Sequence, residues 1–489
     1  MSTEFDAVVV GSGPNGLAAA ILLARAHLKV LVLEAQPTIG GGARTVDLGM
    51  RTGIVHDLCS AVHPMAVASP FMVEFDLAAR GVTLLEPEVQ YAQPLDNGRA
   101  GLAYRDLERT AQGLGPDADA WRALLGYLTR HPDAVVGAAL GDKRSITGPM
   151  VRQAVGMVKF GLTVAEQGTG LWNLRFKDDV APALLSGVAA HAISPLPSFA
   201  AAGTAIMLAT LAHSHGWPIP KGGTGTITDA LVADLRAHGG QIWTDHPVRS
   251  RADLPAAKAY LFDTTPAAAM NILGQEIPAA LTAKLAKFKY GNAAAKVDFV
   301  TSEPVPWINP GMGTAGTVHI GGTRADLARA EAEIARGRFP EAPVVLLSDP
   351  GVVDETRVVG GFRPLWTYAH VPAGSPVDPT EAIIRQIERF APGFRDTIVE
   401  SRAIAADRMS EHNENYIGGD IASGAATLWQ MFARPTPPAN PYALGAPGAY
   451  LCSSSTPPGP GVHGLSGKFA AQRVLRDVFG IEALPSLAP

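Results

Sequence analysis

The sequence has few of the residues that define several large classes of proteins. Its 489 residues include two cysteines, Cys59 and Cys452, too few for a disulfide framework or a four-ligand zinc site. The net charge is −5, and acidic and basic residues are mixed along the chain, so no basic stripe is present to bind nucleic-acid phosphates. We therefore expect no metal ion and no nucleic-acid partner.

The sequence also lacks long hydrophobic runs and hydrolase motifs. Its closest approach to a membrane span, residues 199–212, is shorter than the about 18 residues needed, and we expect a buried helix there. The first ten residues lack the basic and apolar regions of a signal peptide. No G-x-S-x-G motif marks a hydrolase nucleophile. These absences predict a cytoplasmic location and a chemistry other than hydrolysis.

A glycine motif near the N-terminus predicts a nucleotide-binding unit. Residues 5–10 are typical of a buried parallel strand, and residues 11–16 follow with G-x-G-x-x-G spacing. Such glycines permit a tight turn and a close approach of the backbone to a pyrophosphate. Residues 17–26 predict a helix whose N-terminus faces this diphosphate. Residues 29–34 predict the next strand, and its terminal Glu34 is placed to bind ribose hydroxyls.

A second glycine cluster follows this unit. Gly40, Gly41 and Gly42 precede Arg44, whose guanidinium can pair with a phosphate through two hydrogen bonds. NAD and FAD both use the preceding unit. However, the glutamate followed by Gly-Gly-x-x-Arg resembles the FAD-dependent amine oxidase and phytoene desaturase superfamily. The resemblance implies that Arg44 lies against the FAD diphosphate.

A middle segment resembles the same superfamily. Residues 218–250 combine a glycine-rich turn, a helix predicted at 227–237, a Gly-Gly stop and a predicted strand pair. In the superfamily a valine near the end of such a segment meets the adenine through its backbone, which here corresponds to Val248. Residues 259–266 predict the next strand of the nucleotide-binding sheet.

The C-terminal segment supplies a third resemblance. Residues 449–455 predict a strand, and the loop "TPPGPGVHG" leads into a helix predicted at 465–479. This loop is similar to the flavin loop of the superfamily. The similarity implies that Gly461, Val462 and His463 lie near the isoalloxazine ring, with a helix N-terminus at its N1/O2 edge that favours the anionic reduced flavin.

Together these segments resemble the phytoene-dehydrogenase-like subgroup, which includes the pyridine-nucleotide-disulfide-oxidoreductase domain-containing protein 2 group, over nearly the whole chain. The stretches "LWNLRFKDD", "AHSHGWPIPKGG", "QIERFAPGF" and "YIGGDI" look like the same subgroup. The resemblance implies an α/β fold in which a Rossmann-type FAD-binding domain, with a parallel sheet of the glutathione-reductase type, is interleaved with an α+β substrate domain. The FAD-binding domain is assigned residues 1–70, 217–299 and 440–489, and the substrate domain the mostly helical residues 71–216 and the sheet-containing residues 300–439.

The resemblance assigns FAD to residues of all three segments, and we do not expect the cofactor to be bound covalently. Gly222 and Gly223 do not form a second dinucleotide fingerprint, so we expect no stable NAD(P) site. The assigned residues are Gly11, Gly13, Pro14, Asn15, Gly16, Glu34, Ala35, Gly41, Gly42, Ala43, Arg44, Val248, Thr264, Gly461, Val462 and His463.

Lys296 and His463 are the candidate catalytic residues. Lys296 lies on a predicted strand shortly before Trp307. Amine oxidases have a similarly placed lysine that holds a water at flavin N5, although the spacing here departs slightly from theirs. A buried amine beside a flavin can have a lowered pKa and transfer protons, whereas a strand lysine that points to solvent would have no such role. His463 is the histidine expected to touch the flavin.

Two further segments bear on the substrate. Trp366, Tyr368 and His370 predict an aromatic wall of the substrate pocket. Residues 146–167 predict an amphipathic helix. In phytoene desaturases such a helix contacts a membrane and admits a lipid, but we favour a helix packed on its own domain. Its apolar face comprises Met150, Val151, Val155, Val158 and Leu162.

The sequence therefore predicts an FAD-dependent oxidoreductase. The expected substrate is hydrophobic, an isoprenoid or another unsaturated lipid, and the reaction is a hydride transfer to or from flavin N5 in a desaturation or saturation. The alternatives are a flavin amine oxidase, a redox-neutral flavin isomerase and a binding or scaffold protein that retains FAD. An aromatic content of 7% offers little for the aromatic cage of an amine oxidase. The electron acceptor, oxygen or a quinone, the oligomeric state and contact with a membrane surface stay open.

Overall fold

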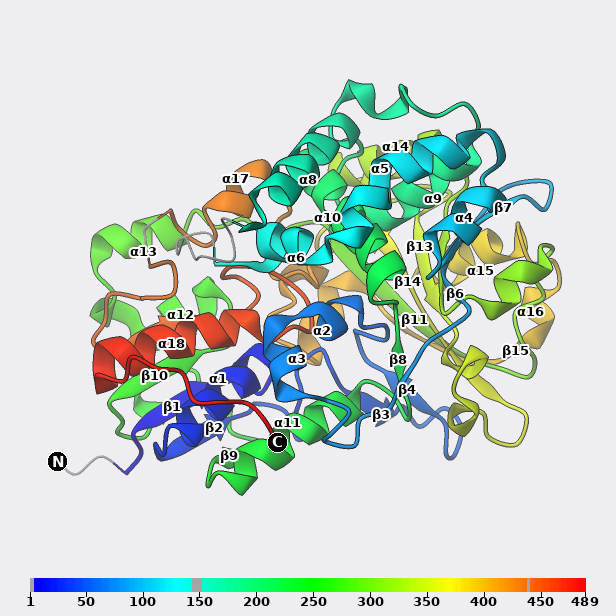
Figure 1. Ribbon diagram of the computed structural model, residues 1–489. Coiled ribbons are helices and arrows are strands. Elements are labelled where there is room, and N and C mark those ends of the chain that lie inside the picture. The colour runs from blue at the N-terminus through cyan, green and yellow to red at the C-terminus, as the bar shows by residue number, and fades with distance from the viewer. Residues whose placement is uncertain (1–3, 143–151, 438–439) are drawn as a thin grey trace.

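Two large sheets organise the computed structural model of the chain, which describes residues 4–142, 152–437 and 440–489 (Figure 1). The smaller of the two is parallel throughout and has the order β16-β10-β1-β2-β9. It takes its strands from three distant stretches of sequence, and the predicted Rossmann-type α/β fold is confirmed. The strands are β1 (Ala7–Val10), β2 (Val30–Leu33), β9 (Gln241–Trp243), β10 (Ala259–Phe262) and β16 (Ala449–Leu451).

Helices cover this parallel sheet, which explains the uninterrupted apolar run of its central strand. Helix α1 (Pro14–Arg25) packs against α11 (Gly225–Ala237) and α18 (Leu465–Phe479). The approach of α18 to α1 requires a glycine, because a Cβ at Gly467 would lie 1.9 Å from the carbonyl oxygen of Asn15. The three helices begin and end within three residues of their predicted positions.

The predicted strand pair after α11 is wrong in its second half. β9 ends at Trp243, and Asp245 then adopts a left-handed φ of 54°. The chain therefore turns away from the edge of the sheet, and Val248 lies in an irregular segment with its side chain buried.

The second large sheet has seven strands in the order β15-β11-β14-β13-β12-β6-β7. Neighbouring strands are antiparallel except β12 and β6. Two of its strands come from residues 89–104, so the stretch 71–216 contributes to the sheet as well as helices. The strands are β6 (Val89–Pro94), β7 (Ala100–Tyr104), β11 (Ala293–Thr301), β12 (Thr317–Ile320), β13 (Val345–Ser348), β14 (Arg363–Val371) and β15 (Ile398–Ile404).

The two faces of the seven-stranded sheet lie against different helices. One face packs Val297, Phe299 and Leu365 against α15 (Thr380–Glu388). The opposite face lies toward helices of the stretch 71–216, and α9 contacts β6, β7 and β12 (Figure 1). These helices are α5 (Ala118–Arg130), α6 (Pro132–Leu140), α8 (Ala154–Gln167), α9 (Val180–Ala189) and α10 (Phe199–Ser214).

Two helical predictions have different outcomes. The buried helix predicted at 199–212 is α10. Within the described ranges, no helix is both long and apolar enough to span a membrane. Of the helix predicted at 146–167, the structure describes α8 (Ala154–Gln167), and Met150 and Val151 lie outside the described residues. α8 packs against α5, α6 and α10 of its own domain, as expected. The face predicted to do so is wrong, because Val155, Val158 and Leu162 are 62%, 61% and 66% exposed.

Candidate functional site

A cavity of about 1160 Å³ lies between the two large sheets. It begins at the carboxyl ends of β1, β2 and β10, where the switch in strand order of an α/β sheet leaves a crevice. It continues along the helix-covered face of the seven-stranded sheet and reaches α8, α10 and α17 (Leu428–Phe432). One cavity therefore joins the glycine motif to the apolar helices of the other half of the molecule.

The glycine motif forms the tight turn that its spacing predicts. Gly11 has a φ of +99°, which an L side chain rarely adopts, and its N–H donates to the Leu33 carbonyl over 2.8 Å. The Gly16 N–H donates to the Asp263 carboxylate over 2.9 Å. A Cβ at Gly13 would lie 2.5 Å from that same carboxylate. Burial raises the pKa of Asp263 to about 7.

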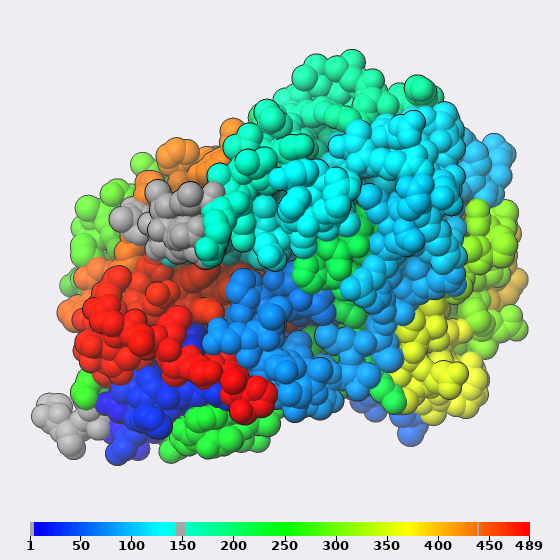
Figure 2. Space-filling model, viewed as in Figure 1, coloured from blue at the N-terminus to red at the C-terminus, as the bar shows by residue number. Residues whose placement is uncertain are grey.

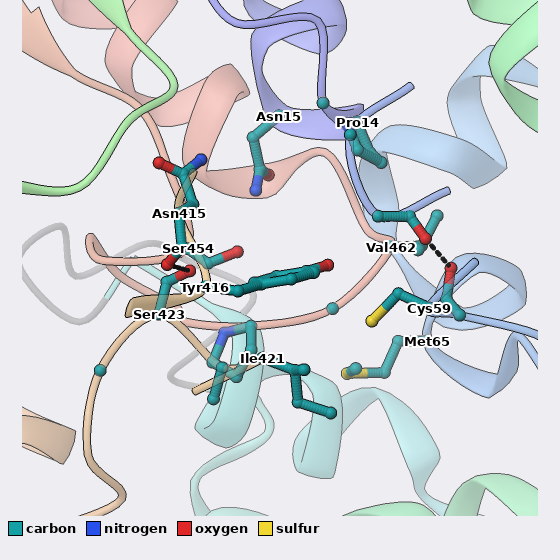
Figure 3. A pocket seen from close by; sticks show the side chains of 18 of the residues that line it. Pro14, Asn15, Cys59, Met65, Asn415, Tyr416, Ile421, Ser423, Ser454 and Val462 are labelled. Carbon is teal, nitrogen blue, oxygen red and sulfur yellow. Dashed lines mark hydrogen bonds between the residues drawn. The ribbon is translucent and has the colours of Figure 1, made fainter. Parts of the chain in front are cut away.

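The side chain of Asn15 is a polar group available to a ligand. It points into the cavity in Figure 3, and its Oδ1 is buried without a hydrogen-bond partner in the part of the chain that the structure describes. A buried amide oxygen left without a partner costs free energy, so a bound hydrogen-bond donor would stabilise it. This position, at the N-terminus of α1, suits a dinucleotide.

Glu34 ends β2 at the wall of the cavity. Its Oε2 accepts hydrogen bonds from the N–H of Ser12 over 2.9 Å and from the Ser12 hydroxyl, and its Oε1 accepts one from Gln36 N–H over 2.9 Å. An ionised carboxylate has about four acceptor sites. Glu34 therefore keeps capacity for a ribose hydroxyl while the protein holds it in place.

Arg44 brings a buried positive charge to the same region. Its Nε donates to the Gly41 carbonyl over 2.7 Å, and its two terminal nitrogens donate to the Thr38 hydroxyl and the His412 carbonyl. Burial lowers the pKa of Arg44, which Glu34 offsets in part. Because a guanidinium has five N–H donors, Arg44 retains two for a phosphate.

The three segments that resemble the superfamily meet on this cavity. Of the residues assigned to the cofactor, Gly16 and His463 do not line the cavity wall. Those that do are Gly11, Gly13, Pro14, Asn15, Glu34, Ala35, Gly41, Gly42, Ala43, Arg44, Val248, Thr264, Gly461 and Val462. The residues present therefore fit a dinucleotide, and their individual contacts with it stay predictions.

The His463 side chain lies behind the loop that was expected to touch the flavin. Its Nδ1 accepts a hydrogen bond from Leu465 N–H over 3.0 Å, and its Nε2 lies 3.1 Å from the Gly459 carbonyl. Burial lowers its pKa to about 4. Both ring nitrogens are engaged in shaping the start of α18, so a positioning role fits this geometry better than proton exchange with a ligand.

Lys296 is buried, and the alternative of a solvent-facing lysine is wrong. Its Nζ donates to Asp298, and Nδ1 of His56 lies 3.4 Å from that carboxylate. Burial alone would raise the pKa of Asp298, but Lys296 and His56 bring it below its usual value. The Nζ lies 5.8 Å from the centre of the Trp366 ring and does not itself line the cavity.

Two of the three residues predicted to form an aromatic wall line the cavity. Trp366 and Tyr368 line the cavity and pack edge to face, with ring centres 5.1 Å apart. His370 stacks behind Tyr368 at 5.6 Å, but it is fully buried, bonds to Glu331 and does not line the cavity.

Residues 412–426 form a cavity wall that motif analysis missed. Tyr416 lies across the cavity between Asn15 and Ile421 in Figure 3. Its hydroxyl lies so close to Gly42 that a Cβ there would be 2.3 Å away, and burial raises the pKa of Tyr416 well above its usual value. The stretch "YIGGDI" resembles the subgroup, but its residue types do not indicate that it lines the cavity.

The comparisons with known proteins agree with this geometry. Residues 9–72 match the family model of the NAD(P)-binding Rossmann-like domain. The chain is 24% identical to pyridine nucleotide-disulfide oxidoreductase domain-containing protein 2 of Rattus norvegicus, over 98% of this chain and 94% of that protein. The resemblance inferred from the motifs is therefore confirmed by a similarity that runs along the whole chain.

Solved structures share the fold at low sequence identity. A putrescine oxidase variant is 16% identical with a TM-score of 0.62, over 97% of this chain and 99% of its own. Cyclohexylamine oxidase from Brevibacterium oxydans IH-35A is 13% identical with a TM-score of 0.58, over the same shares. The arrangement of the two sheets is thus that of these oxidases.

Proposed function

We propose that this protein is an FAD-dependent oxidoreductase that acts on a hydrophobic substrate, an isoprenoid or another unsaturated lipid, in a desaturation or saturation. The observation that carries the proposal is the continuous cavity. At one end it has the glycine turn, Glu34 and Arg44, and at the other it is lined by apolar side chains of α8, α10 and α17. A nucleotide and an apolar molecule would both fit it, end to end.

The residues of the first end would hold the cofactor. Glu34 would accept the ribose hydroxyls, and Arg44 with the N-terminus of α1 would neutralise the diphosphate. The loop at Gly461 and Val462 would face the isoalloxazine ring. Bound FAD would supply the redox chemistry by accepting or donating a hydride at N5.

Around the reacting centre, the chain would exclude water and hold a proton. Trp366 and Tyr368 would orient the substrate, since both line the cavity. Lys296 would hold a proton at Nζ behind Trp366, with Asp298 stabilising its charge.

Apolar side chains at the far end would take the substrate. Met157 and Phe160 of α8, Met207 of α10 and Leu428 and Met431 of α17 line the cavity there. Their thioether and hydrocarbon groups adapt to an unsaturated chain without imposing hydrogen bonds. This lining supports a lipid over a small polar amine.

The two helices α8 and α17, which line this end of the cavity, also carry exposed apolar residues. Leu428 lines the cavity and is 52% exposed, and its neighbour Trp429 is 68% exposed. Figure 2 shows α8 and the chain around α17 next to one another at the surface. We define Val155, Val158, Leu162, Leu428 and Trp429 as the apolar rim and propose that it contacts a lipid surface from which the substrate enters.

Anaerobic bleaching tests the proposal. The purified protein should be yellow and release FAD on unfolding. Mixed without oxygen with separated lipid fractions and amines, it should lose flavin absorbance with a lipid that changes by two hydrogens. A colourless protein that releases no FAD contradicts the proposal. Bleaching by amines alone would assign it to the amine oxidases, and lipid rearrangement without net bleaching would identify an isomerase. FAD that no lipid or amine reduces or consumes would indicate a scaffold.

A further inference from the structure

The end of the cavity against the seven-stranded sheet carries polar groups that the apolar lining does not explain. Thr317, Ser348 and Trp366 all line the cavity. Thr317 pairs with Ser348, and Ser348 pairs with Trp366, across three neighbouring strands. Directly paired residues project from the same face with Cβ atoms about 5 Å apart. The three side chains therefore form one row, which we name the polar row.

Two members of the polar row have unsatisfied donors. Thr317 is 2% exposed and Trp366 is 8% exposed. Neither Thr317 Oγ1 nor Trp366 Nε1 has a hydrogen-bond partner among the residues that the structure describes. The Ser348 hydroxyl donates to the Gly316 carbonyl over 2.9 Å, so its oxygen can accept a further bond. Buried donors without partners are rare in folded proteins, and here they belong to residues that line a cavity.

No free charge accompanies the polar row. Lys296 and Asp298, which lie beside Tyr368 and Trp366 on the next strand, neutralise one another. The charged residues that line the cavity lie elsewhere in the chain, off the strands of this sheet, in the part of the molecule that the structure describes. They are Glu34, Arg44, Arg249, Asp263, Glu414 and Arg434.

The histidines next to the polar row are also uncharged. The His191 and His319 rings meet through their Nε2 atoms at 2.8 Å, so one of them donates and the other accepts. Burial lowers the pKa of His191 to about 3 and that of His319 well below its usual value. Both imidazoles are therefore neutral near pH 7, and an ionised ligand group here would find no counter-charge.

We propose that the polar row binds an uncharged oxygen function, a hydroxyl or carbonyl, at one end of an otherwise apolar substrate. This inference rests on the proposed function and narrows its substrate from a plain hydrocarbon to a neutral oxygenated lipid. The Trp366 N–H and the Thr317 hydroxyl donate to the oxygen, and Ser348 accepts from a hydroxyl. The apolar chain of the substrate extends toward α10 and the apolar rim.

Equilibrium dialysis with eight-carbon probes tests the proposal on the full chain with its native cofactor content. The probes are octan-1-ol, octan-2-one, octane, octanoate and octylammonium. We expect the alcohol or the ketone to bind at least about tenfold more tightly than either ion, because a desolvated charge has no partner there. Thr317→Val should weaken alcohol or ketone binding about five- to tenfold and leave octane unchanged. Trp366→Phe should weaken alcohol or ketone binding more than it weakens octane binding, because it removes the N–H donor together with part of the ring.

Thr367→Val is the matched control. Thr367 lies on β14 next to Trp366 but on the opposite face, and its hydroxyl donates to the Val297 carbonyl over 2.7 Å. The control should lose stability without changing any probe affinity. Tighter binding of an ion, alcohol and ketone binding insensitive to both row variants, or no binding of either neutral probe would overturn the proposal. Dialysis measures binding and needs no turnover. A protein without flavin would therefore contradict the proposed function, while the probe affinities would still test the polar row.

Discussion

Lys296 and Asp298 face the same side of β11 and form a buried ion pair directly behind the aromatic wall of the cavity. The two are 2% and 1% exposed. Removing one partner of such a pair leaves an uncompensated buried charge, which costs about 3–5 kcal/mol. A substitution of Lys296 should therefore change two properties at once: the stability of the sheet, and any proton transfer that Lys296 performs in the reaction.

The first prediction separates these two roles of Lys296. Lys296→Met should lower the rate of anaerobic flavin reduction about 100-fold, the size of a lost general acid or base, while FAD stays bound. It should also lower the melting temperature. Adding Asp298→Asn removes the unpaired carboxylate and should restore stability but not the rate.

Asp298→Asn alone is the control for this pair. It should retain more of the rate than either lysine variant, since Lys296 keeps its amine. Stopped-flow reduction and thermal melts measure the two quantities on the same samples. A Lys296→Met protein that reduces flavin at the unaltered rate would remove this lysine from the mechanism.

The second prediction concerns cofactor affinity. Arg44→Ala should weaken FAD binding about 10- to 100-fold, because charge-assisted hydrogen bonds contribute about 1.5–3 kcal/mol. The FAD affinity of Arg44→Lys should lie between those of Arg44→Ala and the unaltered protein, since lysine keeps the charge but lacks the planar guanidinium. Titration of the apoprotein with FAD, followed by flavin fluorescence, measures the affinity while circular dichroism verifies folding. Equal affinity in all three proteins would place the diphosphate away from Arg44.

A site residue could be predicted from the sequence where its position depends on neighbours in the chain, and could not where its position depends on long-range packing. The glycine turn, Glu34 and Arg44 belong to one contiguous unit whose spacing encodes its geometry, and each lines the cavity. Tyr416 reaches the same cavity through long-range packing, which no local pattern encodes. His463 sits in a correctly identified loop, but the hydrogen bond from Leu465 turns its ring away from the cavity.

Which face of α8 is exposed could not be predicted, for a related reason. A hydrophobic period shows that Val155, Val158 and Leu162 share a helix face, but it does not say what that face meets. In the structure the face points outward beside the cavity, and the buried positions include the small Gly156, where a Cβ would lie 2.4 Å from Ala134.

The third prediction tests the apolar rim as a lipid contact. Val158→Glu with Leu162→Glu should reduce co-sedimentation with neutral phosphatidylcholine vesicles at least about tenfold, because two apolar contacts are replaced by charges that remain hydrated. Val73→Glu is the matched control, since Val73 is 62% exposed on α3 (Pro70–Phe75), away from α8 (Figure 1). The control should sediment like the unaltered protein. Equal vesicle binding by all three proteins would argue against lipid contact through the rim.

The last prediction uses the buried His463 ring. Its pKa of about 4 in the folded protein lies below the about 6.5 of an unfolded histidine, so the folded state binds fewer protons between these values. Stability should therefore be full above pH 6.5 and fall as the pH drops toward 4, with His463 contributing about 3 kcal/mol to the change. His463→Asn keeps an acceptor near Nδ1 but cannot titrate, and it should flatten this part of the profile. Unfolding free energies from denaturant melts at pH 7, 6, 5 and 4 measure the slope. A variant whose slope equals that of the unaltered protein would assign the acid sensitivity to other buried histidines, such as His63 and His213, whose pKa values burial also lowers to about 4.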